Sequence, residues 1–263
     1  MQAYPFHNRD SRAGQAVPRA LIGLRAFREI LVVAIAVLCY FTVRGVMDAR
    51  EATALANADT VIALEQRLGL FWEPNLQRQA LQINHLATIA NWIYIWGHWP
   101  IIAVTLLWLL VRHRDVLSVY RNAMLISGAI GVICFALFPL APPRFMEGLG
   151  FVDTVTLHSS AYRVLQPPSL TNQFAAMPSL HFGWNLLMGI AIWRHARGRL
   201  PRLFSAVMPM LMFVAIVLTA NHYVLDGVAG MAVAVTGLGV ASRFAARQRR
   251  TLPERATLAA ATS

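Results

Sequence analysis

The sequence predicts an all-α fold: a polytopic membrane protein in which six transmembrane helices form a bundle with an amphipathic interfacial segment. Three observations carry this prediction. First, 57% of the 263 residues are hydrophobic, 13% are charged and the mean hydropathy is +0.52, a combination typical of membrane proteins. Second, six segments approach the roughly 20 apolar residues that a spanning helix needs. Third, arginines gather in alternate connections between these segments.

The predicted spans are mainly apolar runs. They cover residues 30–46, 86–111, 123–138, 178–193, 203–220 and 223–242. We expect the spanning domain to occupy residues 28–243, between basic tails at 1–27 and 244–263. A basic start followed by an apolar run is also the pattern of a signal peptide. The length of the first run favours an uncleaved anchor instead.

The arginines predict which helix ends face the cytoplasm. All 23 basic residues are arginine, and seventeen of them precede the first span, follow the sixth, or join the second to the third and the fourth to the fifth. Because short cytoplasmic loops retain positive charge, we expect both termini in the cytoplasm of a multi-pass plasma-membrane protein. Arginine without lysine favours a GC-rich bacterial source. This placement explains the net charge of +11, so no nucleic-acid partner is expected.

Two segments remain on the outer side of the membrane. Residues 48–84 carry apolar side chains among acids and arginines, which is typical of an amphipathic helix in the interface with a packing or anchoring role. Residues 141–177 contain four prolines and no sustained period, which predicts an ordered outer loop near a site.

Ionisable residues inside predicted spans are costly and tend to be functional. Asp226 is the only acid within the last five spans, and it stands four residues after His222. This spacing places the carboxylate one helical turn from the imidazole on the same face. The carboxylate can then hold one ring nitrogen and leave the other free to attack or to bind.

A second polar group is expected at the same membrane level. A Pro-Ser-Leu-His motif at residues 178–181 opens the fourth span, where the unpaired amides of a helix start favour an anion. We expect Ser179 to cap this helix or to contact a phosphate. Arg144 follows the outer end of the third span. The sequence thus brings Arg144, Ser179 and His181 to the membrane face that holds His222.

This set of side chains suits phosphoryl transfer. An arginine binds phosphate oxygens with two parallel hydrogen bonds. One histidine attacks phosphorus, and the other protonates the departing oxygen. The scheme needs no metal ion and no cofactor.

Two other functions use the same residues. In a non-enzymatic membrane carrier, His222 and Asp226 would form a proton relay, but Arg144 would lack a purpose and no inverted repeat is evident. A haem or quinone protein needs histidines that face each other, and His98 offers a poor partner. We assign His98 and His85 to an aromatic interface belt without a further role.

With these motifs placed, the sequence resembles the type 2 phosphatidic acid phosphatase superfamily and, within it, the branch of inositol phosphorylceramide synthases. The second motif of that superfamily, Pro-Ser-x-His, is met by Pro178, Ser179 and His181. Its third motif, His-x-x-x-Asp, is met by His222 and Asp226. The branch is further indicated by a Pro-Pro-Arg element at residues 142–144 and by three residues after the last histidine, which are Tyr223, Gly230 and Ala234.

The sequence departs from the phosphatase pattern at four positions. The lysine and proline of the first motif are replaced by Leu137 and Phe145, and the Ser-Arg pair of the third motif by Ala215 and Ile216. Two phosphate-binding cations are therefore missing, for which Arg163 is a candidate substitute. These losses favour the synthase-like branch.

The resemblance implies a mechanism on the outer side of the membrane. His222 would form a phosphohistidine, Asp226 would orient it, His181 would protonate the leaving alcohol, and Arg144 would stabilise the equatorial oxygens. The substrate would be a lipid phosphate or a phospholipid, possessing a head group such as inositol phosphate in the synthase-like case. Water or a second hydroxyl would resolve the intermediate, and the sequence leaves open which one. It also leaves the oligomeric state open.

Overall fold

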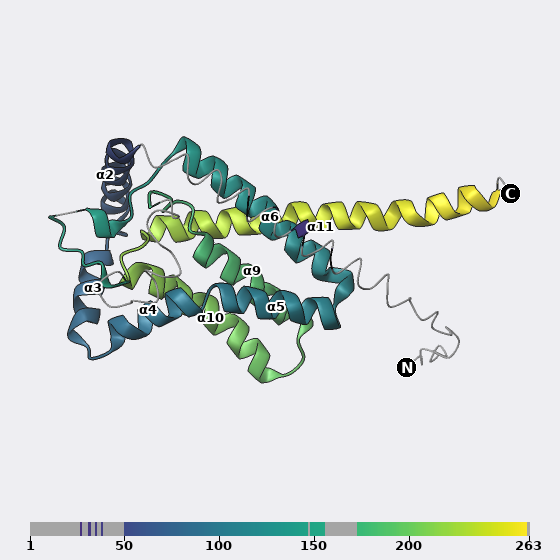
Figure 1. Ribbon diagram of the computed structural model, residues 1–263, viewed down its shortest axis with the longest axis horizontal. Helices are drawn as coiled ribbons and strands as arrows, with labels where there is room; N and C mark the ends of the chain where they lie inside the picture. The colour runs from purple at the N-terminus through teal and green to yellow at the C-terminus, as the bar shows by residue number, and fades with distance from the viewer. Residues whose placement is uncertain are drawn as a thin grey trace, which may run out of the picture. The chain divides into compact units, whose positions relative to one another are not determined.

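The computed structural model describes residues 50–146, 148–155 and 173–261, together with Phe27, Leu31, Val32, Ile35 and Leu38. The chain divides into two compact units, Met1–Cys39 and Tyr40–Ser263. In the second unit the described helices are α2 (Glu51–Leu68), α3 (Glu73–Gln82), α4 (Leu86–Trp96), α5 (Trp99–Arg112), α6 (Arg114–Leu137), the short 3₁₀ helix η1 (Pro143–Phe145), α9 (Leu180–His195), α10 (Arg199–Leu218) and α11 (Val224–Ala261) (Figure 1). The described residues contain no strand beyond one isolated bridge, so the predicted all-α class is confirmed.

Three described helices are long and apolar enough to cross a membrane. They cover Arg114–Leu137, Arg199–Leu218 and Val224–Gln248, and the bent pair α4 and α5 makes a fourth if it counts as one span. Helix α9, predicted as a span at 178–193, has 16 residues. The predicted span at 30–46 lies outside the described residues except for four helical positions. Three to four spans are therefore observed, and six remain a prediction.

The second predicted span is broken in its middle. Helices α4 and α5 meet at an angle of 41° around Gly97 and His98. Pro100 stands in the first turn of α5 and has no N–H to continue the hydrogen-bond ladder of α4. A Cβ on Gly97 would also meet the Ile93 carbonyl and the Met208 side chain. The proline and this close packing together explain why the apolar run 86–111 is two helices.

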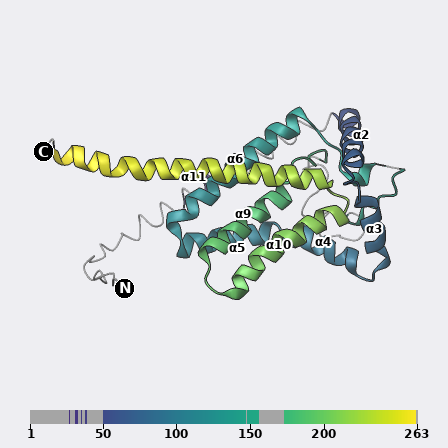
Figure 2. The ribbon, with the colours of Figure 1, turned by 180° about the vertical axis from the view of Figure 1, so that it is seen from behind.

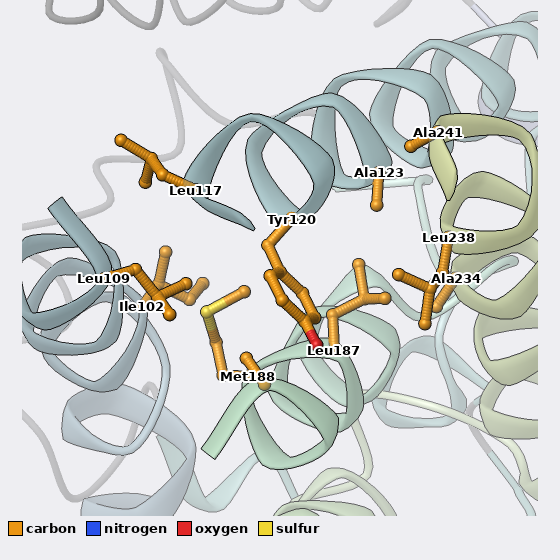
Figure 3. Packing of buried hydrophobic residues seen from close by; sticks show 11 residues of the cluster. Ile102, Leu109, Leu117, Tyr120, Ala123, Leu187, Met188, Ala234, Leu238 and Ala241 are labelled. Atoms are coloured by element: carbon orange, nitrogen blue, oxygen red, sulfur yellow. The ribbon is translucent and has the colours of Figure 1, made fainter. Parts of the chain in front are cut away.

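Helix α9 lies at the centre of the bundle. It packs against α5, α6, α10 and α11, and both views show it between α11 and α10 (Figures 1 and 2). The main core gathers apolar side chains from α5, α6, α9 and α11, among which Tyr120 and Leu187 are almost fully buried (Figure 3). Because four helices pack around α9, the position of its first residues is fixed relative to the rest of the bundle.

Two glycines let α9 and α11 cross at backbone contact. A Cβ on Gly183 would lie 2.6 Å from the Gly230 carbonyl oxygen, and a Cβ on Gly230 would overlap the backbone of Ser179. Any side chain at Gly230 would push the two helices apart. This crossing sets the start of α9 directly beside the start of α11.

The segment predicted as one amphipathic helix is a corner of two helices. Helix α2 ends at Gly69, which has a φ of +68° that residues with a side chain rarely adopt, and α3 begins four residues later. The buried face of α2 includes Ala54, Ala58 and Ile62 and packs on the segments around Leu140. The packing role expected for this segment therefore fits its apolar face.

Candidate active site

Four segments converge at one end of the bundle to form the candidate site. The Ser179 amide donates to the Asp226 carbonyl oxygen at 2.9 Å, which joins the starts of α9 and α11. The Arg144 amide donates to the Ala220 carbonyl oxygen at 3.0 Å, which joins η1 to the connection after α10. The five residues singled out in the sequence therefore come from segments that are hydrogen-bonded to one another.

His222 lies in the short connection between α10 and α11, and its side chain is largely buried. Its Nδ1 lies 2.8 Å from the Ala176 carbonyl oxygen and 3.4 Å from Oδ2 of Asp226. Because both neighbours of Nδ1 are acceptors, they favour the tautomer with a proton on Nδ1. In this tautomer Nε2 holds the lone pair of the ring.

Asp226 is fully buried in the first turn of α11. Its Oδ2 accepts a hydrogen bond of 2.9 Å from the Tyr223 amide while it lies beside the ring of His222. The carboxylate thus ties the helix start to the imidazole. The nearer acceptor of Nδ1 is Ala176, so the ring is held from two sides.

Arg144 is linked to His222 through Asn221, the residue directly before His222. Its guanidinium donates from Nη1 to the side-chain oxygen of Asn221. Its Nε lies 3.6 Å from the Asp153 carboxylate and its charge lies over the Phe145 ring. Asn221 and Asp153 were not identified from the sequence.

The loop that carries Asp153 is anchored by amide side chains of two helices. Gln77 of α3 contacts both backbone groups of Val152, at 2.8 and 2.9 Å. Asn91 of α4 donates to the Thr154 carbonyl oxygen at 2.8 Å. The described part of the predicted outer loop is therefore ordered beside the site, whereas Arg163 lies outside the described residues.

His181 is held in a stack of rings. Its imidazole stacks on Tyr94 with a centroid distance of 4.4 Å and on His98 with 4.2 Å, and lies 6.0 Å from the His222 ring. His98 is 3% exposed, which corrects its assignment to an interface belt. The bend between α4 and α5 turns His98 inward, and an apolar pattern read as one straight helix does not reveal it.

Ser179 precedes the first residue of α9 and is fully buried. Its hydroxyl makes no cap hydrogen bond to the helix, so the expected capping role is wrong. Among the described residues, its Oγ has no hydrogen-bond partner. A buried hydroxyl of this kind has a donor available for a ligand.

Two buried glutamates were missed in the sequence. Glu73 accepts a hydrogen bond of 3.0 Å from the Val224 amide, and Glu65 one of 2.8 Å from the Leu225 amide. Glu65 follows Val61 and Ile62 at helical spacing, so it lies on the buried face of α2. An acid on an otherwise apolar face was the available signal.

The family model of the PAP2 superfamily matches residues 59–240, more than half of the chain. The chain belongs to the PAP2 superfamily. PAP2 proteins are generally phosphoric ester hydrolases, and membership indicates a lipid phosphatase or phosphotransferase. The apolar helices are consistent with a PAP2 membrane protein. No significant match was found among curated proteins or among solved structures.

Proposed function

We propose that this PAP2 protein is a lipid-phosphate phosphatase or phosphotransferase in which His222 attacks phosphorus and carries the phosphoryl group. The observation that supports the proposal is the pair of acceptors around Nδ1 of His222, at 2.8 and 3.4 Å. They hold the proton on Nδ1, so the lone pair needed for attack is on Nε2.

The first step of the proposed reaction forms the phosphohistidine. Nε2 of His222 forms a bond to phosphorus while the bond from phosphorus to the leaving oxygen breaks, and His181 gives its proton to that oxygen. Arg144 and the buried hydroxyl of Ser179 bind the remaining phosphate oxygens. Asp226 and Ala176 stabilise the ring, which gains positive charge.

The second step releases the phosphoryl group. Water or a lipid hydroxyl attacks phosphorus, His181 takes the proton, and the bond between phosphorus and Nε2 breaks. Water gives a phosphatase, and an alcohol gives a transferase. The reaction requires no metal ion or cofactor in either case.

We further propose the synthase-like branch, in which a phospho-head group such as inositol phosphate passes between lipids. Ala215 and Ile216 occupy the positions of the Ser-Arg pair of the phosphatase pattern, and both are buried in an apolar cluster with Met212 and Val217. No cation from this part of α10 can bind the phosphate. Arg144 is the guanidinium that the described residues bring to the candidate site. A phosphate site with few cations suits a diester, which carries less charge than a monoester.

The proposed topology has six spans over residues 28–243 and cytoplasmic tails at 1–27 and 244–263. The candidate site lies where α6 and α10 end and α9 and α11 begin, whereas Arg112, Arg114, Arg194 and Arg199 lie at the opposite ends of these helices or of α5. Because arginines favour the cytoplasmic side, this arrangement supports a site on the outer side of the plasma membrane.

The test is turnover by purified protein in detergent with a panel of lipid phosphates and diesters. We expect phosphate release or transfer to an added alcohol that survives a chelator and disappears in His222→Ala. His85→Asn, at an exposed position, is the matched control and retains turnover. Substrate labelled at phosphorus should leave a label on the protein that is stable to alkali and lost in acid. Equal turnover by wild type and His222→Ala would refute the nucleophile.

A further inference from the structure

The start of α11 is capped by three acids. The amides of Tyr223, Val224 and Leu225 donate to Asp226, Glu73 and Glu65, at 2.9, 3.0 and 2.8 Å. The first amides of a helix have no partner within the helix, and a nearby polar side chain commonly satisfies one of them while others bind water. Here two of the three acceptors come from residues 151 and 160 positions earlier in the chain.

Both distant acids are fully buried, which is costly for a carboxylate. Their second oxygens, Oε2 of Glu65 and Oε2 of Glu73, have no donor among the described residues. Two carboxylates cannot hydrogen bond to each other, but a protonated carboxyl can donate to its neighbour. Burial, and after it the hydrogen bond to Glu73, raises the pKa of Glu65 from 4.5 to about 9. A proton on Glu65 would allow its carboxyl group to donate to Glu73.

The corner between α2 and α3 brings the two acids together. Glu65 lies in the last turn of α2, and Glu73 is the first residue of α3. Gly69 has a left-handed backbone conformation that ends α2, and the Leu70 amide donates a hydrogen bond of 2.8 Å to the Glu65 carbonyl oxygen. The corner thus offers two carboxyl groups on one side, and α11 begins against them.

The cap lies next to the nucleophile. His222 directly precedes the three capped amides, and its own amide donates to the Ile216 carbonyl oxygen at 3.1 Å. A shift of the α11 start would move His222 relative to Ala176 and Arg144, which belong to other segments. A buried carboxyl group costs free energy unless hydrogen bonds compensate for it, and here the compensating donors are the amides at the start of α11.

We infer that Glu65 and Glu73 are positioning residues: their shared cap on the first amides of α11 fixes the direction in which Nε2 of His222 points. The inference rests on the proposed function, because it assigns His222 as the nucleophile. In this role both glutamates act through the start of α11 and not directly on the substrate. Their effect is therefore on the rate of the chemical step rather than on substrate binding.

The experiment compares five variants in the full-length protein in detergent. Glu65→Gln and Glu73→Gln each keep an oxygen for the helix amide, and the new amide group can donate to the remaining carboxylate. In the double Gln variant the two side-chain NH₂ groups both need an acceptor, and neither can satisfy the other while both side-chain oxygens bind the helix amides. Glu73→Ala removes one acceptor, and Glu51→Gln, at the exposed start of α2, is the matched control.

We expect the double Gln variant and Glu73→Ala to lose about 100-fold in kcat with KM unchanged, since a displacement of about 1 Å at reacting atoms costs that much. Each single Gln variant should retain most of the wild-type kcat, and the Glu51→Gln control should match wild type. If Glu73→Ala fails to fold, the comparison of single with double Gln variants decides. Full kcat in the double variant, or a single Gln loss as large as that of alanine, would overturn the inference.

Hydrogen exchange of the amides at 223–225, followed by mass spectrometry, tests the cap without catalysis. Exchange should be faster in the double Gln variant than in wild type and in either single variant. Unchanged exchange would overturn the inference even if His222 is the nucleophile. Turnover that survives in His222→Ala would instead refute the proposed function, and the exchange data would still decide whether the two glutamates cap the helix.

Discussion

Arg144 donates a hydrogen bond from its guanidinium to the side-chain oxygen of Asn221, the residue directly before His222. Asn221 is itself fixed, because its amide nitrogen donates to Oγ1 of Thr219 at 2.9 Å. The Arg144 amide also donates to the neighbouring Ala220. The cation and the candidate nucleophile are therefore linked through one buried asparagine.

Asn221→Ala should lower kcat/KM for phosphate release. A hydrogen bond to a charged group contributes about 1.5–3 kcal/mol, which corresponds to about 10- to 100-fold in rate. Asn221→Asp keeps an acceptor for Arg144 and should retain more of the rate than alanine. Asn84→Ala, at an exposed position, is the control. A wild-type kcat/KM in Asn221→Ala would show that Arg144 does not depend on this bond.

His98→Ala should lower kcat, because it removes one of the two rings that hold His181. A stacked pair of rings stabilises a side-chain arrangement by about 0.5–1.5 kcal/mol, so we expect kcat to fall by about 2- to 10-fold. His98→Phe keeps a flat ring and should lose less. Trp92→Ala, on the exposed side of α4, should have no effect on kcat. Equal rates for His98→Ala and His98→Phe would exclude a role for the stack.

Gly230→Ala should destabilise the protein, since the new Cβ would overlap the backbone of Ser179. Overpacking of this kind typically costs about 1–3 kcal/mol. Gly239→Ala in the same helix meets nothing within 4 Å and should leave stability unchanged or raise it. Thermal unfolding in detergent measures both. Equal midpoints for the two variants would contradict the close crossing of α9 and α11.

The stability of the protein should depend on pH through Glu65. The folded chain holds a proton on this carboxyl up to about pH 9, whereas an unfolded chain releases it near the usual pKa of 4.5. The contribution of Glu65 to the free energy of unfolding is therefore fully present below 4.5 and falls as the pH rises to about 9. The groups that face Glu65 are Glu73, Asp226 and Tyr223.

Glu65→Gln isolates this effect, because glutamine does not titrate. The unfolding midpoint of the variant minus that of wild type should increase between pH 5 and pH 9, as measured by thermal scans in one detergent. A difference that stays constant over this range would show that Glu65 is ionised in the folded protein.

The sequence alone was enough to predict the all-α class and the superfamily. Long apolar runs produce helices because each run must satisfy its own backbone hydrogen bonds. His222 and Asp226 are four residues apart, which predicted that their side chains lie close together, and short motifs in this order indicated the PAP2 resemblance. His222 itself lies in the connection before α11 and not on its helical face. These features depend on residues that are close in the chain, so they can be predicted from short stretches of sequence.

Only the tertiary structure decided which side chains support the candidate site. Asn221 meets Arg144 across 77 residues, and Glu65 meets the Leu225 amide across 160. The bend at Gly97 turned His98 towards His181, where a straight helix predicted an interface position. Such contacts follow from how the helices pack around α9 and cross at Gly183 and Gly230. Packing depends on the shapes of surfaces that are distant in the chain, so the periodicity of a single helix does not predict it.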